Sequence, residues 1–181
     1  MPLSEAAIAP CVARGDHGIV DSNHPEQVEN RLKSDRVAEF LHSLDPGSGA
    51  DFEAASLRGY LTCFNGGCYY EAHDVLEQLW LRHGREHSDY AFHKGLIQLA
   101  GGFVHLRLQF LHPDHPKHGR RLDPARRLLL LAEANLGRYP EDHLGLDVEV
   151  AKALARKTAD SIGVGDGLKN PWSPDMRPMI G

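Results

Sequence analysis

The segment from Ser88 to Leu111, SDYAFHKGLIQLAGGFVHLRLQFL, decides the fold of this chain. Ser88 can cap a helix there, and Pro113 prevents its continuation beyond Leu111. Apolar side chains cover nearly the whole circumference of this helix, which is typical of a helix at the centre of a bundle. The adjacent glycines Gly101 and Gly102 disfavour a helix, which suggests that a close backbone approach requires them. One narrow polar stripe remains, which either faces solvent or lines an interior site: Lys94, Gln98, His105 and Gln109.

Helical patterns also precede and follow this central segment. Asp123 and Pro124 suit the N-cap and the first position of a helix, and Gly137 suits its end. Consecutive alternating segments of strand length do not occur. The sequence therefore predicts an all-α fold, a single-domain antiparallel bundle of five to six helices. Besides the central helix, we expect helices over about residues 23–45, 52–64, 69–83, 123–136 and 146–162.

The two ends of the chain lack helical periodicity. Residues 1–22 mix glycine, proline and scattered charge, and we expect a loose N-terminal leader there. The helical bundle domain is expected over residues 23–163. Residues 164–181, which include Trp172, are expected to form an irregular C-terminal tail with few core contacts.

Composition excludes several classes of protein. With 181 residues, 41% hydrophobic and 25% charged, the chain resembles an ordinary soluble domain and contains no apolar run of the roughly 18 residues that a membrane span needs. A net charge of -5 makes nucleic acid an unlikely partner. The first residues carry Glu5 and no basic start, unlike a signal peptide, and the three cysteines lack CxxC spacing, which favours reduced thiols. We therefore expect a cytoplasmic protein without a membrane partner.

The 12 histidines are an unusual number, and histidine is the commonest metal ligand. In the predicted helix 69–83, His73 lies one turn before Glu77, so the two side chains can share a metal ion or a proton. Trp80 follows on the same edge of the helix, and antiparallel packing predicts that it contacts the amino-terminal half of the central helix. A helical wheel places Ala72, Val75, Leu76 and Leu79 on the apolar arc, and Glu71, Asp74 and Gln78 on the more exposed side.

Two blocks of this sequence resemble a known family. The first runs from Phe64 to Trp80, FNGGCYYEAHDVLEQLW, and the second from Lys94 to His105, KGLIQLAGGFVH. Their residue types and order resemble those of the small all-helical family named domain of unknown function 309. With the leucine-rich helix that follows, the family-like core covers about residues 52–137. The resemblance implies a helical bundle, and the name of the family leaves its activity open.

The resemblance marks eight positions as a candidate site. We expect a polar site where the helix 69–83 meets the stripe of the central helix. It would bind a small molecule or a metal, and hydrolysis is a reaction that such a site can carry out. His73, Glu77 and His105 are the candidate metal ligands, and a divalent transition metal suits imidazole with carboxylate. The candidate site residues are Asn65, Tyr70, Glu71, His73, Glu77, Trp80, Gln98 and His105.

Other interpretations of the same residues stay open. His73 with Glu77 can be an ordinary surface pair, and the polar stripe can be a solvated helix face. Trp80 and the stripe could instead form the protein interface of an assembly module. The partner at such an interface could be a second copy of this chain, which would make a homo-oligomer. The basic residues from Lys117 to Arg127 could contact an anion or RNA. The histidines between His112 and His118 lie in a proline-broken loop, where an exposed linker is the simpler interpretation.

Overall fold

The fold described below is that of a computed structural model, which describes Val37, Glu39 and residues 52–181. The expected leader over residues 1–22 lies outside the described residues. The expected helix over residues 23–45 also lies outside them, apart from Val37 and Glu39.

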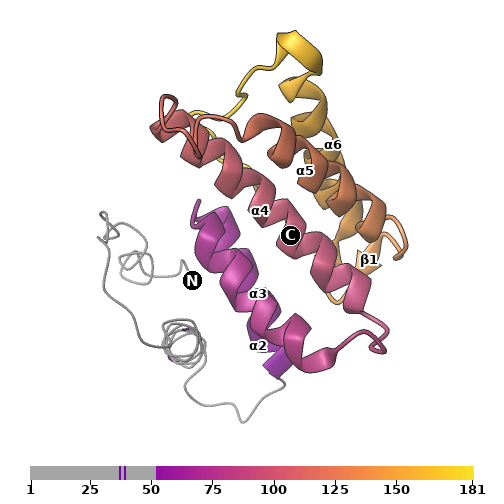
Figure 1. The fold of residues 1–181 in the computed structure, drawn as a ribbon. Coiled ribbons are helices and arrows are strands. Elements are labelled where there is room, and N and C mark those ends of the chain that lie inside the picture. The colour runs from indigo at the N-terminus through magenta and orange to yellow at the C-terminus, as the bar shows by residue number, and fades with distance from the viewer. Residues whose placement is uncertain (1–36, 38, 40–51) are drawn as a thin grey trace.

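Five α-helices make up most of the described part of the chain (Figure 1). Their bounds confirm the predicted helices to within about two residues, and the predicted all-α bundle is the observed fold. Two short turns, at residues 66–68 and 84–89, join the second, third and fourth helices. The helices are α2 (Phe52–Asn65), α3 (Tyr69–His83), α4 (Tyr90–Leu111), α5 (Leu122–Leu136) and α6 (Val148–Ile162).

Two helix starts differ from the sequence prediction. The N-cap of α4 is Asp89 and not Ser88, whose hydroxyl instead donates to Asp89 Oδ2 at 3.2 Å. Helix α5 begins at Leu122, so Pro124 occupies its third position and not its first. A proline is tolerated there because the N–H groups of the first turn have no acceptor within the helix.

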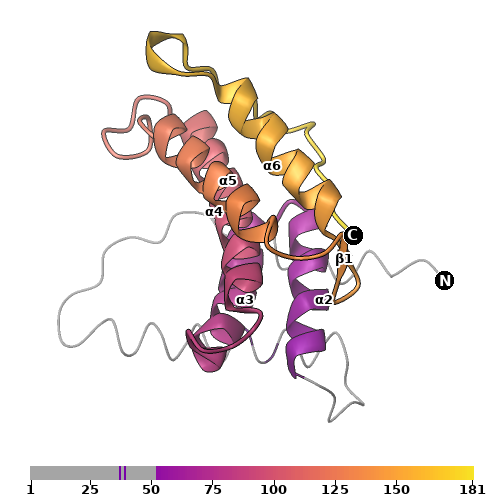
Figure 2. The same cartoon turned by 90° about the vertical axis from the view of Figure 1, so that its right-hand side faces the viewer.

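Helix α4 lies at the centre of the bundle, as its apolar circumference predicts (Figures 1 and 2). It packs against α3 on one side and α5 on another, while α6 packs on α5 and α2 on α3. The buried Tyr60 hydroxyl of α2 donates to the Leu96 carbonyl of α4 at 2.8 Å. A Cβ atom at Gly102 would lie 2.8 Å from the Leu129 side chain of α5, so this glycine permits the close approach of the two helices. The predicted close contact at the glycine pair is therefore confirmed.

A small hairpin precedes α6 and was not expected from the sequence. Strand β1 (Asp142–His143) pairs antiparallel with β2 (Leu146–Asp147). The two residues between the strands, Leu144 and Gly145, have φ angles of 53° and 78°, which suit a tight hairpin turn. Strands of two residues are too short to show alternation, which is why the sequence pattern does not reveal them.

The C-terminal segment after α6 is irregular, with one short 3₁₀ helix at Gly165–Gly167, but it belongs to the core. Trp172 is buried and its ring lies 5.0 Å from that of Phe110 at the end of α4. Ile180 is buried, and the chain end lies beside α2 and the hairpin (Figure 2). The expectation of few core contacts over 164–181 is therefore wrong, because single large side chains anchor a segment without periodicity.

Two further sequence expectations concern the environment of the protein. Within the described residues, no helix is both long enough and apolar enough to cross a membrane. Cys63 is a buried free thiol, and burial raises its pKa to about 12. Cys68 is disulfide-bonded, so the expectation of reduced thiols is wrong at this position.

Candidate functional site

Three metal-capable side chains gather along one edge of α3. His73, Asp74 and Glu77 each offer a ligand atom, and these atoms all lie within 4.8 Å of one another. His73 Nδ1 lies 3.3 Å from Asp74 Oδ1, and Glu77 follows one turn after His73. We call these three residues the α3 site.

Asp74 is the unexpected member of the α3 site. The helical wheel places it on the exposed side, but its exposed fraction is only 7%. A carboxylate is buried at a helix surface when it has partners, and Asp74 and Glu77 each make a further interaction besides those described above. The prediction of an exposed Asp74 is therefore wrong, whereas His73 and Glu77 are half-buried as expected for the edge of the apolar arc.

The glycine pair of α4 brings that helix next to His73. A Cβ atom at Gly101 would lie 3.9 Å from His73 Cδ2 and 3.3 Å from the Leu128 side chain of α5. The imidazole therefore lies over a part of α4 that carries no side chain. The edge of α3 therefore meets α4 at Gly101, whereas the stripe residues Gln98, His105 and Gln109 make hydrogen bonds with Asn135 and Arg121.

The segment that contains both helices matches a known family. Residues 57–112 match the family described as Domain of unknown function (DUF309). This match confirms the resemblance of the two sequence blocks and covers most of α2 with all of α3 and α4. It ends before α5. No curated protein and no solved structure matches the chain.

His105, the third predicted metal ligand in the DUF309 segment, lies outside the group of metal-capable atoms at the α3 site. Its Nδ1 atom accepts a hydrogen bond from Arg121 Nη1 at 2.9 Å. Burial, the nearby Arg121 cation and His118 lower the pKa of His105 to about 4. The structure therefore places Asp74, and not His105, with His73 and Glu77.

Gln98 and Asn65, two other candidates in the DUF309 segment, take part in packing. Gln98 Oε1 accepts a hydrogen bond from Asn135 Nδ2 of α5 at 2.8 Å. The Asn65 amide makes two hydrogen bonds with the backbone of Ile180, which ties the end of α2 to the chain end. These contacts give both residues an architectural explanation.

The aromatic and acidic candidates on α3 have different surroundings. The Trp80 ring lies 5.0 Å from that of Tyr90 in the first turn of α4, which confirms the predicted contact with the amino-terminal half of that helix. Trp80 is half-buried, so its ring is not an open docking surface. Tyr70 has an exposed fraction of 55% and Glu71 is half-buried, and neither belongs to the metal-capable group.

Of the five basic residues from Lys117 to Arg127, three are exposed and two are half-buried. Arg121 is half-buried on His105, and Arg126 is half-buried in the first turns of α5. In the preceding loop, His115 Nδ1 accepts backbone N–H groups of Lys117 and His118, as in an ordinary loop turn. The arrangement adds no support to an anion or RNA contact.

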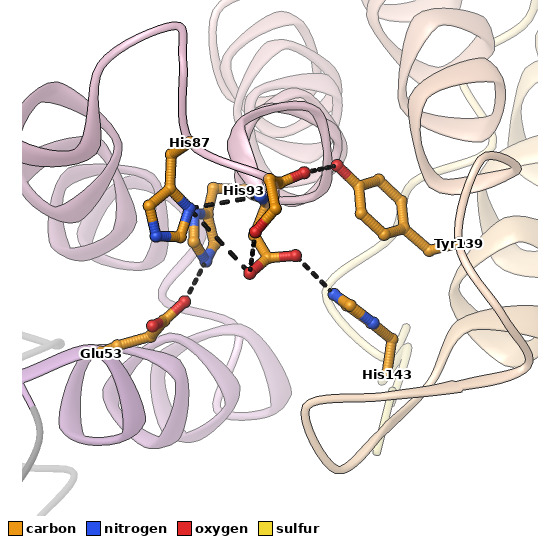
Figure 3. A network of polar contacts seen from close by, with 7 residues as sticks. Glu53, His87, His93, Tyr139 and His143 are labelled. Atoms are coloured by element: carbon orange, nitrogen blue, oxygen red, sulfur yellow. Dashed lines mark hydrogen bonds and ion pairs between the residues drawn. The ribbon is translucent and has the colours of Figure 1, made fainter.

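Sequence reasoning missed a second group of metal-capable residues at the other end of α3. Glu53, His83 and His93 each offer a ligand atom within 4.8 Å of the others. Figure 3 shows two of them, Glu53 and His93, side by side. Glu53 precedes the segment that matches DUF309. The available signal was the pair of histidines on either side of the short turn after Gly84, but the carboxylate comes from another helix.

Proposed function

We propose that the protein binds a divalent transition-metal ion at the α3 site, through His73, Asp74 and Glu77. The observation that carries this proposal is the mutual distance of their ligand atoms, all within 4.8 Å. Ligands around a metal at about 2.0–2.2 Å would have to draw slightly closer together, which small rotations of side chains on one helix edge can provide. A metal would share or replace the existing partners of the two carboxylates.

The ligand types set the class of metal. One imidazole with two carboxylates favours zinc-like or iron-like ions over magnesium or calcium, which prefer oxygen ligands alone. A metal binds an imidazole only through an unprotonated ring nitrogen, so protons compete with the metal for this ligand. Three protein ligands leave positions for water or a substrate, as in catalytic zinc sites.

The reaction class we propose for this site is hydrolysis of a small molecule by a metal-activated water. The half-buried position of His73 and Glu77 supports access from solvent, and a bound metal lowers the pKa of its water toward neutrality. Metal-dependent cleavage of a nitrophenyl ester or a nitrophenyl phosphate tests this. If a metal-loaded protein cleaves neither probe, the hydrolytic assignment fails and metal binding is judged separately.

The metal itself is tested by elemental analysis of purified protein. His73→Gln and Glu77→Gln should each reduce the retained zinc or iron, while the matched control His112→Gln, an exposed loop histidine, should not. Equal metal content in all these variants would refute binding at the α3 site.

A further inference from the structure

The second group lies where three helices approach one another. Glu53 is in the first turn of α2, His83 is the last residue of α3, and His93 is in the first turn of α4. Their ligand atoms all lie within 4.8 Å of one another. His93 Nε2 lies 3.3 Å from Glu53 Oε1 (Figure 3). We call these residues the turn site.

His93 is the unusual member of the turn site. Its side chain is 0% exposed, and among the described residues neither ring nitrogen has a hydrogen-bond partner. His83 Nδ1 is likewise buried without one. Burial and the surrounding histidines His83, His87 and His143 lower the pKa of His93 to about 4, while Asp89 opposes them. A buried imidazole without a hydrogen bond is costly, since polar groups in a protein interior are nearly always satisfied.

In the described part of the chain, the neighbours of the turn site pack around its histidines without a hydrogen bond to either ring nitrogen of His93. His87 stacks on His83 with ring centroids 3.7 Å apart, and its Nδ1 accepts the backbone N–H of Asp89. A neutral imidazole that accepts at Nδ1 carries its proton on Nε2, so His87 is not a ligand in this arrangement. Asp89 in turn receives a 2.8 Å hydrogen bond from His143 of the hairpin (Figure 3).

We propose that Glu53, His83 and His93 bind a second divalent transition-metal ion of the zinc class. Two imidazoles and one carboxylate are a common zinc ligand set, with a fourth position for water. The metal would bind one ring nitrogen of each histidine, which would satisfy one of the two His93 nitrogens that lack a hydrogen bond within the described residues. This inference goes beyond the proposed function, because the two sites share no ligand residue.

The placement of the ligands gives this ion a structural role. It would join the start of α2 to the end of α3 and the first turn of α4. Binding to the folded state only would stabilise that state by an amount that rises with the logarithm of the metal concentration above the dissociation constant. Zinc should therefore raise the melting temperature through the turn site.

Zinc titration of the metal-stripped full-length chain tests this proposal. The variants are His83→Gln, Glu53→Gln, His73→Gln and the control His112→Gln, with circular dichroism to verify folding. His83 and Glu53 are half-buried, so their glutamine variants keep the test usable if the buried His93→Gln variant fails to fold. Binding stoichiometry, affinity and melting temperature are measured for each protein.

We expect His83→Gln and Glu53→Gln to weaken one binding event at least tenfold and to remove the thermal shift, while His73→Gln leaves that event intact. If the α3 site is empty in solution, the wild type should still bind one ion that only the turn-site variants lose. Binding that is unchanged in His83→Gln and Glu53→Gln would overturn the proposal, whatever His73→Gln does. Zinc binding that falls equally in His112→Gln would also overturn the proposal, because it would indicate adventitious binding of zinc by surface histidines.

Discussion

Arg121 at the start of α5 donates a 2.9 Å hydrogen bond to His105 on α4, and this contact requires a neutral imidazole. The pKa of His105 is lowered from 6.5 to about 4 by burial, by the Arg121 cation and by His118. The stability of the packing between α4 and α5 should therefore depend on pH.

The first prediction concerns that pH dependence. Between pH 6.5 and 4 the unfolded chain binds a proton at His105 that the folded chain does not, so this residue's contribution to stability is complete above pH 6.5 and is lost on acidification. His105→Gln should reduce the fall in unfolding free energy over this range by roughly 1–2 kcal/mol, a figure that allows for solvent screening. Urea unfolding at several pH values measures it, and an unchanged slope would contradict the neutral-histidine contact.

The second prediction separates the two glycines of α4. Gly102→Ala should destabilise by about 1–3 kcal/mol, because a Cβ atom there would lie 2.8 Å from the buried Leu129 side chain. Gly101→Ala has its nearest contact at 3.3 Å on half-buried Leu128, and the gain in helix propensity of about 1 kcal/mol should leave it near neutral. Thermal unfolding of both variants checks the pair. Equal effects would show that α4 and α5 do not approach as described.

The third prediction concerns the C-terminal segment. Asn65→Ala removes both hydrogen bonds to Ile180 and should cost roughly 1–2 kcal/mol. It should also speed proteolysis within residues 164–181. Thr62→Ala, one turn earlier on the same helix, removes a hydrogen bond within the helix and serves as the matched control. Equal protease resistance in Asn65→Ala and the wild type would show that Asn65 does not anchor the tail.

The sequence predicts the helices well because their signals are local. Gly84 ends α3, and the spacing of Ala72 and Leu76 identifies its buried face. Features that depend on tertiary packing could not be predicted from such local signals. Asp74 is buried by partners that its position on the wheel does not reveal, and Trp172 joins the core from a segment without periodicity.

The same distinction between local and tertiary signals applies to the residues of the candidate site. His73 and Glu77 share one helix, so their proximity follows from helix geometry alone. The predicted third ligand, His105, belongs to another helix, and the packing directs it to Arg121 instead. The turn site escaped prediction for the same reason, because Glu53 and His93 belong to different helices and meet only in the folded bundle.

The central claim, metal binding at the α3 site, is tested most directly by calorimetric zinc titration of metal-stripped protein in which His83→Gln has removed the turn site. The account predicts one binding event in this background, with affinity falling at least about tenfold when Glu77→Gln or His73→Gln is added. It also predicts that adding His112→Gln leaves the affinity unchanged. A zinc affinity that is the same with and without His73 and Glu77 would contradict the claim.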